Sequence, residues 1–489
     1  MEKIKFDFNN MFDFNIGHQH GITYQDIESF SSVIEKAKKH FKKIISTQES
    51  RIKLGLEWIK LPYQDKKTVN EIQKFGKEIS LEFENVLFLG IGGSYLGLKA
   101  AQDALCSPYY NEFPTARRKT PKIYFEGNNL DPTTLSVLIK NLNPKKTFVV
   151  VISKSGETIE TKIAFNIVSK WLKRSVGKNY ARHIFVITDP TSGSLRKFIE
   201  EYQKKDKLSF RNQPLLKGVG GRYSELNIGL LHFAIVGVEI QEILNGAKYM
   251  SEICQESSLY RNPAYMYAVL QTILYLKKNK YISVIMPFSE GLKSTADWYV
   301  QLLAESLGKK YSRKIIINNN IEEWIEDKHH IVNVGRTPIS ARGTNDLHSI
   351  QQNNVHGMNN KTITFIKILN FKNNIIISDT GDFIAKQKYS DLINLAQEAT
   401  EWACVREKRP NCTIILPELN PYTWAQLIFF FEVATAFEGE LLNVNAFDQP
   451  GVESYKNYMY YKLGKKGISE EIEKEIKSYP LIKKQKLII

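Results

Sequence analysis

The chain has 489 residues, of which 43% are hydrophobic and 11% aromatic, and a formal net charge of +15. This length exceeds the size at which one hydrophobic core keeps growing, so we expect two domains. The sequence holds no run of about eighteen apolar residues, and Met1-Glu2-Lys3-Ile4-Lys5 does not resemble a secretory signal. Composition therefore argues against a membrane span and favours a cytoplasmic protein.

The basic charge raises the question of a nucleic-acid partner. Lysines are spread along the chain and interleaved with acids, apart from short clusters at 38–43 and 483–486, which is typical of solvated faces. We therefore expect neither nucleic acid nor a membrane as a partner, although a positive field would help to collect a small anionic substrate. Four cysteines at 106, 254, 404 and 412 form no C-x-x-C pair, so neither a zinc site nor a disulfide framework is predicted.

Taken in chain order, the predicted elements form two α/β series. Residues 1–58 begin with a polar, aromatic-rich arm and a helical stretch. Strand candidates then recur between helix-length segments, at 86–89, 123–125, 147–152 and 183–188, which predicts a doubly wound domain over 59–238.

A second series follows a helical region at 227–275. Strand candidates at 281–287, 362–369 and 413–416 and helix candidates at 295–307 and 422–437 predict a second such domain over 239–450. Residues 451–489 form a C-terminal helix and arm. The expected fold is thus two doubly wound parallel-sheet α/β domains with helical arms at both ends.

Two short loops combine glycines and hydroxyls at strand ends: Gly90–Gly97 and Ser153–Thr158. Each follows a continuous apolar run, as expected for a parallel strand buried on both faces, and each precedes a helix. Such sheets bind ligands at their carboxyl ends, where glycines admit the backbone and free N–H groups favour a dianion. The pattern predicts a cradle for a phosphate monoester.

Spacing separates this cradle from better-known loops. The sixth position of a dinucleotide fingerprint that starts at Gly90 is Tyr95 rather than glycine, and neither loop fits a nucleotide P-loop. For either loop alone, an ordinary strand-to-helix turn is an equal alternative. Two hydroxyl-rich loops in one chain weaken that alternative.

Four further segments carry groups able to do chemistry. Arg222 follows a glycine turn, where it could stabilise negative charge, although a surface arginine is the plainer interpretation. Gln301 and Glu305 share one helical face, with Glu305 beside apolar residues as a candidate general base; a solvent-facing glutamate is the alternative.

The two remaining segments offer a histidine and a lysine. His348 stands in a loop near Asp346, which could orient it, but a lone loop histidine is more often incidental. Lys456 follows a Gln-Pro-Gly turn at Gln449, about one turn into a new helix, where it could project back toward a site. Taken alone, it indicates only a helix start.

Together these motifs carry a family resemblance. In order along the chain they are GIGGSYLG, SKSGETIET, GVGGRYS, QLLAESLGK and FDQPGVESYK, with GTNDLHS as a looser match. From Gly90 to Lys456 the chain resembles the phosphoglucose isomerase family in its shorter bacterial form. The paired sugar-isomerase (SIS-type) domains of that family match the two predicted α/β halves.

The resemblance implies roles for individual residues. Phosphate and substrate binding would fall to Gly93, Ser94, Ser153, Lys154, Ser155, Thr158, Gln301 and Gln449. Glu157 departs from the threonine of many relatives, and we expect it to point away from the phosphate. Catalysis would fall to Glu305, His348, Lys456 and Arg222.

The implied reaction is the reversible isomerisation of D-glucose 6-phosphate and D-fructose 6-phosphate, in glycolysis and gluconeogenesis. His348 and Lys456 would open the sugar ring, Glu305 would carry a proton between C2 and C1, and Arg222 would stabilise the cis-enediolate. No cofactor or metal is implied. The family histidine reaches the site from a second subunit, which implies a homodimer with a shared active site.

Three alternatives stay open at this point. A non-catalytic SIS-type sugar-phosphate sensor would need the loops but not the catalytic set. The basic surface could serve a secondary binding role, and the pocket could also admit mannose 6-phosphate.

Overall fold

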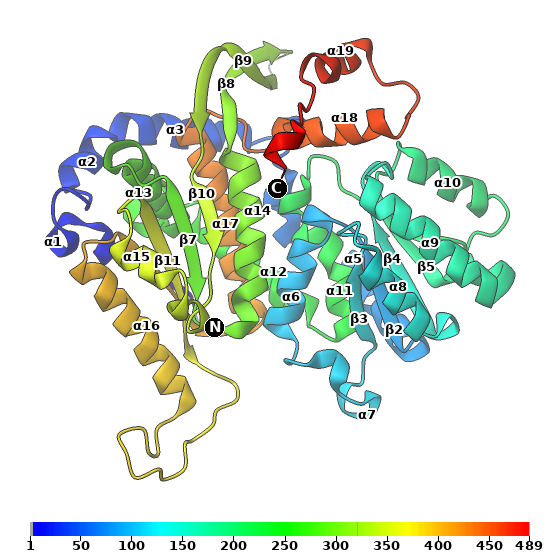
Figure 1. Ribbon diagram of the computed structural model, residues 1–489, viewed down its shortest axis with the longest axis horizontal. Helices are drawn as coiled ribbons and strands as arrows, with labels where there is room; N and C mark the ends of the chain where they lie inside the picture. Colours follow the sequence, from blue (N-terminus) through cyan, green and yellow to red (C-terminus); the bar gives the residue numbers. More distant parts are fainter. Residues whose placement is uncertain (1–2, 320, 489) are drawn as a thin grey trace. The chain divides into compact units, whose positions relative to one another are not determined.

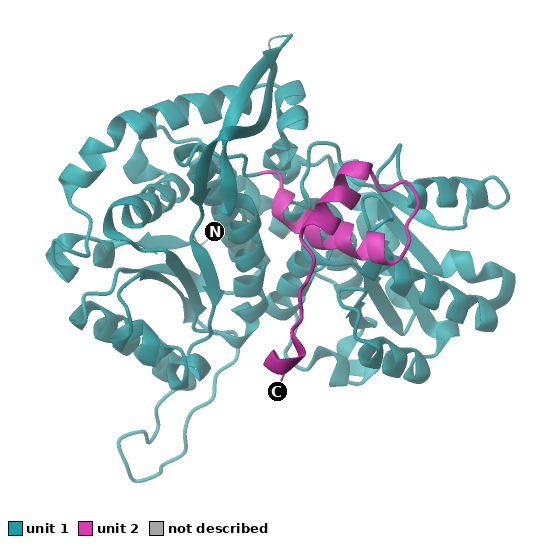
Figure 2. Cartoon of the chain, turned by 45° about the horizontal axis from the view of Figure 1, so that its top comes forward, with its two compact units in different colours: residues 1–446 teal, residues 447–489 magenta. Residues whose placement is uncertain are grey.

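The structure is a computed structural model that describes residues 3–319 and 321–488. The chain forms two compact units, of which the first ends at Ala446 and the second begins at Phe447 (Figure 2). The first unit holds both five-stranded sheets and the two-stranded sheet β8-β9.

The first sheet has five strands, all parallel, in the order β3-β2-β4-β5-β6 (Figure 1). In chain order these strands are β2 (Asn85–Leu89), β3 (Lys122–Glu126), β4 (Thr147–Ile152), β5 (Ile184–Thr188) and β6 (Arg211–Pro214). The first four coincide with predicted strands. The edge strand β6 is polar and carries no apolar run that would predict it.

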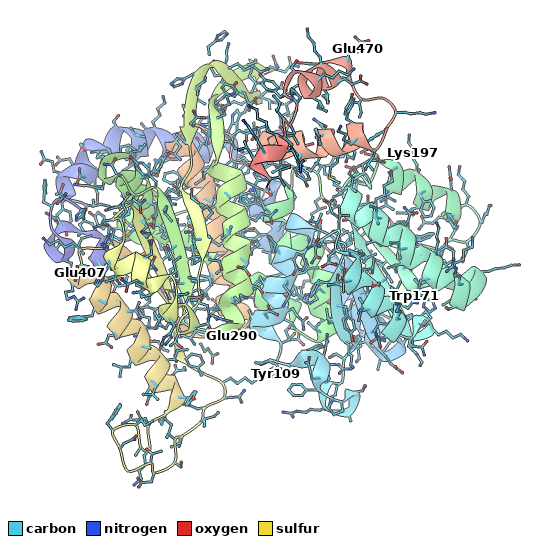
Figure 3. All side chains as sticks on the ribbon, viewed as in Figure 1. Tyr109, Trp171, Lys197, Glu290, Glu407 and Glu470 are labelled. Atoms are coloured by element: carbon cyan, nitrogen blue, oxygen red, sulfur yellow. The ribbon has the colours of Figure 1, made fainter. Side chains whose placement is uncertain are left out.

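Both faces of this sheet are covered, because alternate residues of a strand point to opposite sides. Val86 and Phe88 belong to one buried cluster, and Leu87 and Leu89 belong to another. Trp171, labelled in Figure 3, packs half-buried against the second cluster. The helices of the first face are α5 (Lys66–Glu82), α6 (Leu96–Leu105) and α11 (Glu225–Val236), and those of the second are α8 (Pro132–Asn141), α9 (Ile159–Val176) and α10 (Ser194–Gln203).

The second sheet has the order β1-β12-β11-β7-β10 and is parallel except at one edge. That edge is β1 (Lys5–Asp7), which the N-terminal arm adds antiparallel to β12. The other strands are β7 (Ile282–Pro287), β10 (Thr337–Ser340), β11 (Lys361–Asn370) and β12 (Asn411–Glu418).

Helices also cover both faces of the second sheet (Figure 1). One face carries α13 (Pro263–Lys278), α14 (Lys293–Leu307) and α17 (Pro421–Leu441), and the other carries α15 (Gln351–His356) and α16 (Tyr389–Arg406). All residues of α17 from Tyr422 to Leu441 are buried, which explains why apolar side chains lie on every face of this helix. Two covered parallel sheets confirm the predicted fold class.

The remaining helices of the first unit are mostly short. They are α1 (Asp13–Ile16), α2 (Tyr24–Ser29), α3 (Ser31–Ile44), α4 (Gln48–Leu54), α7 (Thr115–Arg118) and α12 (Ile240–Ile253). Among the described residues, no helix is both long and apolar enough to cross a membrane.

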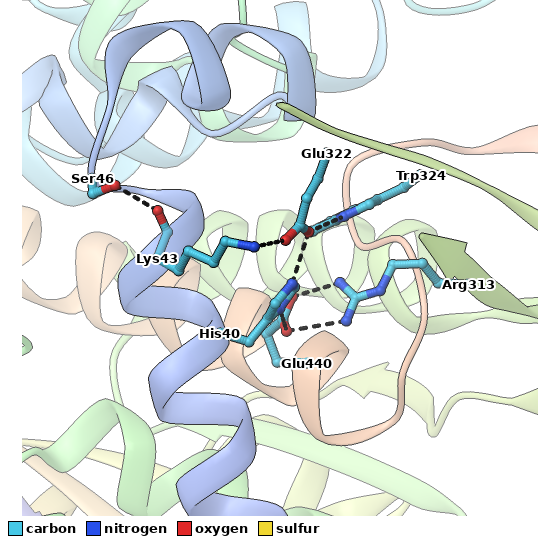
Figure 4. A network of polar contacts seen from close by, with 7 residues as sticks. All are labelled: His40, Lys43, Ser46, Arg313, Glu322, Trp324 and Glu440. Atoms are coloured by element: carbon cyan, nitrogen blue, oxygen red, sulfur yellow. Dashed lines mark hydrogen bonds and ion pairs between the residues drawn. The ribbon is translucent and has the colours of Figure 1, made fainter. Parts of the chain in front are cut away.

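A two-stranded hairpin, β8 (Lys309–Asn318) and β9 (Ile321–Val334), begins directly after α14. Its two strands are tied to α3 and α17 by the polar network of Figure 4. Arg313 donates to both oxygens of Glu440, at 2.6 and 3.1 Å. His40 lies between the carboxylates of Glu440 and Glu322, at 2.5 and 2.8 Å.

This network also sets the charge of His40. Burial lowers the pKa of His40, but its hydrogen bonds to the two glutamates outweigh burial and raise that pKa above its usual value. A protonated His40 satisfies both carboxylates at once. The network therefore holds both strands of the hairpin against α3 and α17.

The second unit contains α18 (Glu453–Lys462) and α19 (Glu470–Ser478), with Glu470 labelled in Figure 3. The predicted boundaries at 58, 238 and 450 remain predictions.

Candidate functional site

Three of the sequence motifs meet beyond the carboxyl end of β2. The loop after β2 forms a short turn, η3 (Gly92–Ser94), and the Arg222 loop forms another, η7 (Gly221–Tyr223). A Cβ added at Gly93 would lie 2.1 Å from the carbonyl carbon of Gly221, and one added at Gly92 would lie 3.0 Å from Gln301 Nε2. Only glycine permits this approach, so the sequence brings a phosphate-loop candidate against the Arg222 loop and α14.

Arg222 is buried, with 3% of its surface exposed. Its Nε donates to Ser306 Oγ at 2.9 Å, its Nη2 donates to the Ala446 carbonyl at 2.7 Å, and its Nη1 donates to Glu305 Oε2 at 3.2 Å. These contacts fix the plane of the guanidinium. The surface-arginine interpretation is therefore wrong for Arg222.

Glu305 lies on α14 and receives donors on both carboxylate oxygens. Besides Arg222, Gln301 Nε2 donates to Glu305 Oε1 at 3.0 Å from one turn earlier on the helix. About a quarter of the Glu305 side chain, 26%, stays exposed, so the carboxylate is held in place yet accessible. Gln301 Oε1 is buried and accepts no hydrogen bond from any described residue.

The second loop lies at the carboxyl end of β4, the strand next to β2. The buried Ser153 accepts a hydrogen bond from Gly156 N at 3.1 Å, while Lys154 and Ser155 are exposed. Thr158 is the N-cap of α9 and makes no capping hydrogen bond with its side chain. No Thr158 cap therefore occupies the first N–H groups of α9, an arrangement suited to an anion.

Glu157 forms an ion pair with Lys162, whose Nζ lies 3.2 Å from Glu157 Oε2. Because Lys162 stands on the first turns of α9, this pairing offsets the negative charge that Glu157 brings to the loop.

His348 ends the short turn η10 (Asn345–His348), which follows β10. It is exposed, and among the described residues it makes no hydrogen bond or ion pair with Glu305 or Arg222. Asp346 accepts hydrogen bonds from Arg342 N at 2.7 Å and from Asn345 Nδ2 at 3.0 Å, so its carboxylate is occupied by neighbours other than His348.

Gln449 and Lys456 belong to the second unit. Gln449 precedes the turn η11 (Pro450–Val452), and Lys456 stands on α18. Lys456 Nζ donates to Glu453 Oε1 at 2.8 Å. Burial lowers the pKa of Lys456, but the Glu453 carboxylate outweighs burial and raises it, so Lys456 carries an ammonium at neutral pH.

Two partners of Arg222 have no signal of their own in the sequence. Ser306 is fully buried, accepts a hydrogen bond from Arg222 and shares another with the Tyr223 hydroxyl at 3.1 Å. The Ala446 carbonyl is the other partner. Only its position next to Glu305 could have indicated a role for Ser306. The sequence does not indicate which backbone carbonyl would accept a hydrogen bond from Arg222.

Comparisons with known proteins agree on one family. Residues 66–478 match a family model described as phosphoglucose isomerase. A glucose-6-phosphate isomerase of Carboxydothermus hydrogenoformans is 37% identical over 97% of this chain and 97% of its own length. Its counterpart in Acetivibrio thermocellus is 32% identical over 97% and 99%.

Solved structures share the fold. A hypothetical protein from Thermus thermophilus has a TM-score of 0.79 at 28% identity, over 94% of this chain and 99% of that one. A glucose-6-phosphate isomerase from Chlamydia trachomatis has a TM-score of 0.72 at 20% identity, over 94% and 90%.

Proposed function

The chain belongs to the phosphoglucose isomerase family, and on that premise we propose that it interconverts D-glucose 6-phosphate and D-fructose 6-phosphate, with Glu305 as the base. One observation carries the assignment of the base: Arg222 and Gln301 each donate to one oxygen of the Glu305 carboxylate, beside the glycine loop of the first sheet. A carboxylate held so firmly and still accessible suits proton transfer.

Ring opening comes first in the proposed mechanism. The proton of the C1 hydroxyl leaves while the ring oxygen gains one, so that the C1–O5 bond breaks and an aldehyde forms at C1. His348 and the Lys456 ammonium would move these protons.

Isomerisation follows on the open chain. Glu305 removes the proton from C2, which leaves a cis-enediolate whose negative charge lies near the Arg222 guanidinium. Glu305 then returns the proton to C1 while the proton of the C2 hydroxyl passes to O1, which gives the ketose with its carbonyl at C2. Because Arg222 is buried and fixed by Ser306 and Ala446, it needs little reorganisation to stabilise that charge.

The two glycine loops would hold the phosphate group. Gly93 and Ser94 come from the first loop, and the second supplies the residues 153–155 and Thr158. Gln301 and Gln449 would contact sugar hydroxyls.

We further propose a homodimer in which His348 serves the site of the partner chain. The exposure of His348 and the absence of a contact with Glu305 within the described residues support this arrangement. A dilution series tests it: turnover per chain should fall as dimers dissociate, and a stable monomer with full turnover would contradict it. The proposed setting is cytoplasmic, in glycolysis and gluconeogenesis.

The decisive assay measures conversion of fructose 6-phosphate to glucose 6-phosphate in buffer with EDTA, for the wild type and for Glu305→Gln. We expect robust wild-type turnover and a loss of about 10²-fold or more in the variant. Glu398→Gln, an exposed glutamate on α16, is the matched control and should keep full activity. Sugar-phosphate binding without turnover in all three proteins would favour the sensor alternative instead.

A further inference from the structure

Three buried cations line the amino ends of adjacent strands in the second sheet. Lys280 precedes β7 by two residues, Lys361 begins β11, and Arg409 precedes β12 by two residues. Their exposed fractions are 0%, 4% and 8%. Since β12, β11 and β7 are neighbours, the three residues lie together at the amino-terminal ends of these strands, opposite their carboxyl ends.

Both lysines are held by neutral oxygens. Lys280 Nζ donates to the Asn359 carbonyl at 2.6 Å and to Asn359 Oδ1 at 2.7 Å. Lys361 Nζ donates to the Met358 carbonyl at 2.9 Å. The segment 358–360 therefore orients the two ammonium groups without neutralising them.

No carboxylate of residues 3–319 or 321–488 pairs with the cluster. Among the described residues, no carboxylate lies within 4.0 Å of the charged nitrogens of Lys280, Lys361 or Arg409, since none forms an ion pair. Glu401, on α16, accepts instead from Asn10 Nδ2 at 2.6 Å and from Gln397 Nε2 at 2.8 Å.

Burial and the neighbouring positive charges destabilise the charged forms of both lysines, which lowers their pKa values. Burial, and then the charges of Arg409 and Lys361, lower the pKa of Lys280 to about 8. Burial and Arg409 likewise lower the pKa of Lys361. Buried like charges destabilise one another unless an anion compensates them.

Arg409 supplies an independent observation. Its Nε and Nη1 atoms are buried and have no hydrogen-bond partner among the described residues. Unsatisfied buried donors on a guanidinium are rare, and a guanidinium N–H donates readily to an oxyanion.

We propose that Lys280, Lys361 and Arg409 bind a phosphate group. An unpaired guanidinium donor of Arg409 would hold one of its oxygens, and the two ammonium groups would neutralise its charge. The half-buried His20, whose Nδ1 lies 3.3 Å from Lys280 Nζ, and the exposed Lys408 form the outer side of the cluster. A bound phosphate would bridge the starts of three strands and stabilise the second sheet.

Thermal unfolding tests this site in solution. Phosphate should raise the melting temperature of the wild type above that in chloride of matched ionic strength, by roughly 1–2 °C for this site alone. Arg409→Gln should lose that increment and keep only the part due to the substrate site. The matched control is Arg406→Gln, an exposed arginine on the same connection, which should respond as the wild type does. An unchanged phosphate response in Arg409→Gln would overturn the proposal.

The source of the phosphate group is settled by a second titration, with glucitol 6-phosphate in place of phosphate. An Arg409-dependent shift with both compounds indicates a site for phosphorylated metabolites. A shift with inorganic phosphate alone indicates a site for the free ion.

Crystals of the wild type give a test that depends on no variant. After a selenate soak, an anomalous peak within hydrogen-bond distance of Arg409 Nε and one of the two lysines is expected. A water molecule or empty density at that position, with selenate bound elsewhere, would contradict the proposal.

Discussion

Ser306 accepts a hydrogen bond from Arg222 Nε at 2.9 Å, and both side chains are buried. Ser306 is the neighbour of Glu305 on α14, so one helical turn holds both the proposed base and an anchor of the proposed electrophile. The distance between base and guanidinium is thereby set by a single rigid element.

Ser306→Ala should lower kcat roughly tenfold with little change in KM, because it leaves a buried guanidinium donor unsatisfied and loosens a group that acts on the enediolate. Steady-state kinetics of fructose 6-phosphate turnover measure both constants. Ser306→Thr, which keeps the hydroxyl, should restore much of kcat. Ser251→Ala, a buried serine on α12, is the control; an equal loss of kcat there would show that Ser306 matters only for folding.

Arg222→Lys should lower kcat/KM by about 10²-fold or more. A lysine cannot reproduce three donors in one plane to Ser306, Glu305 and Ala446. Arg336→Lys changes another buried arginine, paired with Glu438 at 2.6 Å, and should lower the melting temperature while kcat stays near the wild type. Near-native kcat/KM in Arg222→Lys would remove Arg222 from the mechanism.

His348→Ala should impair turnover of cyclic glucose 6-phosphate more than turnover of the open-chain form, because the proposed role of His348 is ring opening. The histidine is exposed, so the melting temperature should not change. Stopped-flow measurement of turnover, started from the cyclic form or from the open-chain form of the substrate, separates ring opening from isomerisation. His356→Ala, an exposed histidine on α15, serves as control. Equal losses on both substrate forms would remove the ring-opening role.

The stability of the protein should fall as pH rises between about 4.5 and 7. Glu225 and Glu432 are buried against each other; burial raises the pKa of Glu225 to about 7, and burial and then the Glu225 charge raise that of Glu432 well above its usual value. The folded chain then holds protons that the unfolded chain releases above about pH 4.5, so stability is full below that pH and is lost through pH 7.

Glu432→Gln tests this assignment, because it keeps a hydrogen-bond donor and removes one of the two carboxyls. The change in unfolding free energy between pH 5 and 8 should shrink by roughly 1–3 kcal/mol relative to the wild type, as followed by urea unfolding. Parallel pH profiles for both proteins would show that the pair does not share a proton.

Much of the fold could be predicted because the sequences of its central strands are continuous apolar runs. Residues 148–152 form such a run, and they are buried on both faces. The strands β1, β6 and β10 are short and sit at sheet edges, so their sequences need no such run. The β8–β9 hairpin has much exposed surface, and it is held by His40 and Glu440, which are far from it in sequence.

The site was predictable in its residue types more than in its contacts. Glu305 and Gln301 share a helical face, which spacing reveals. Pairing of Arg222 with Glu305 joins residues 83 positions apart, and spacing carries no such information. What overturns the surface-arginine interpretation is burial, which depends on the packing of α14 against the Arg222 loop.

Gly93, in the loop after β2, lies against Gly221, in the Arg222 loop. This contact determines which glycines of these two loops can be replaced by alanine. An alanine methyl at 93 would meet the Gly221 backbone at 2.1 Å, whereas one at 220 or 221 would find its nearest neighbour at 3.9 or 3.8 Å. In a library selected for growth on activity, position 93 should accept glycine alone, while alanine persists at 220 and 221. At this contact, position 93 cannot carry a methyl group, whereas positions 220 and 221 of the Arg222 loop can.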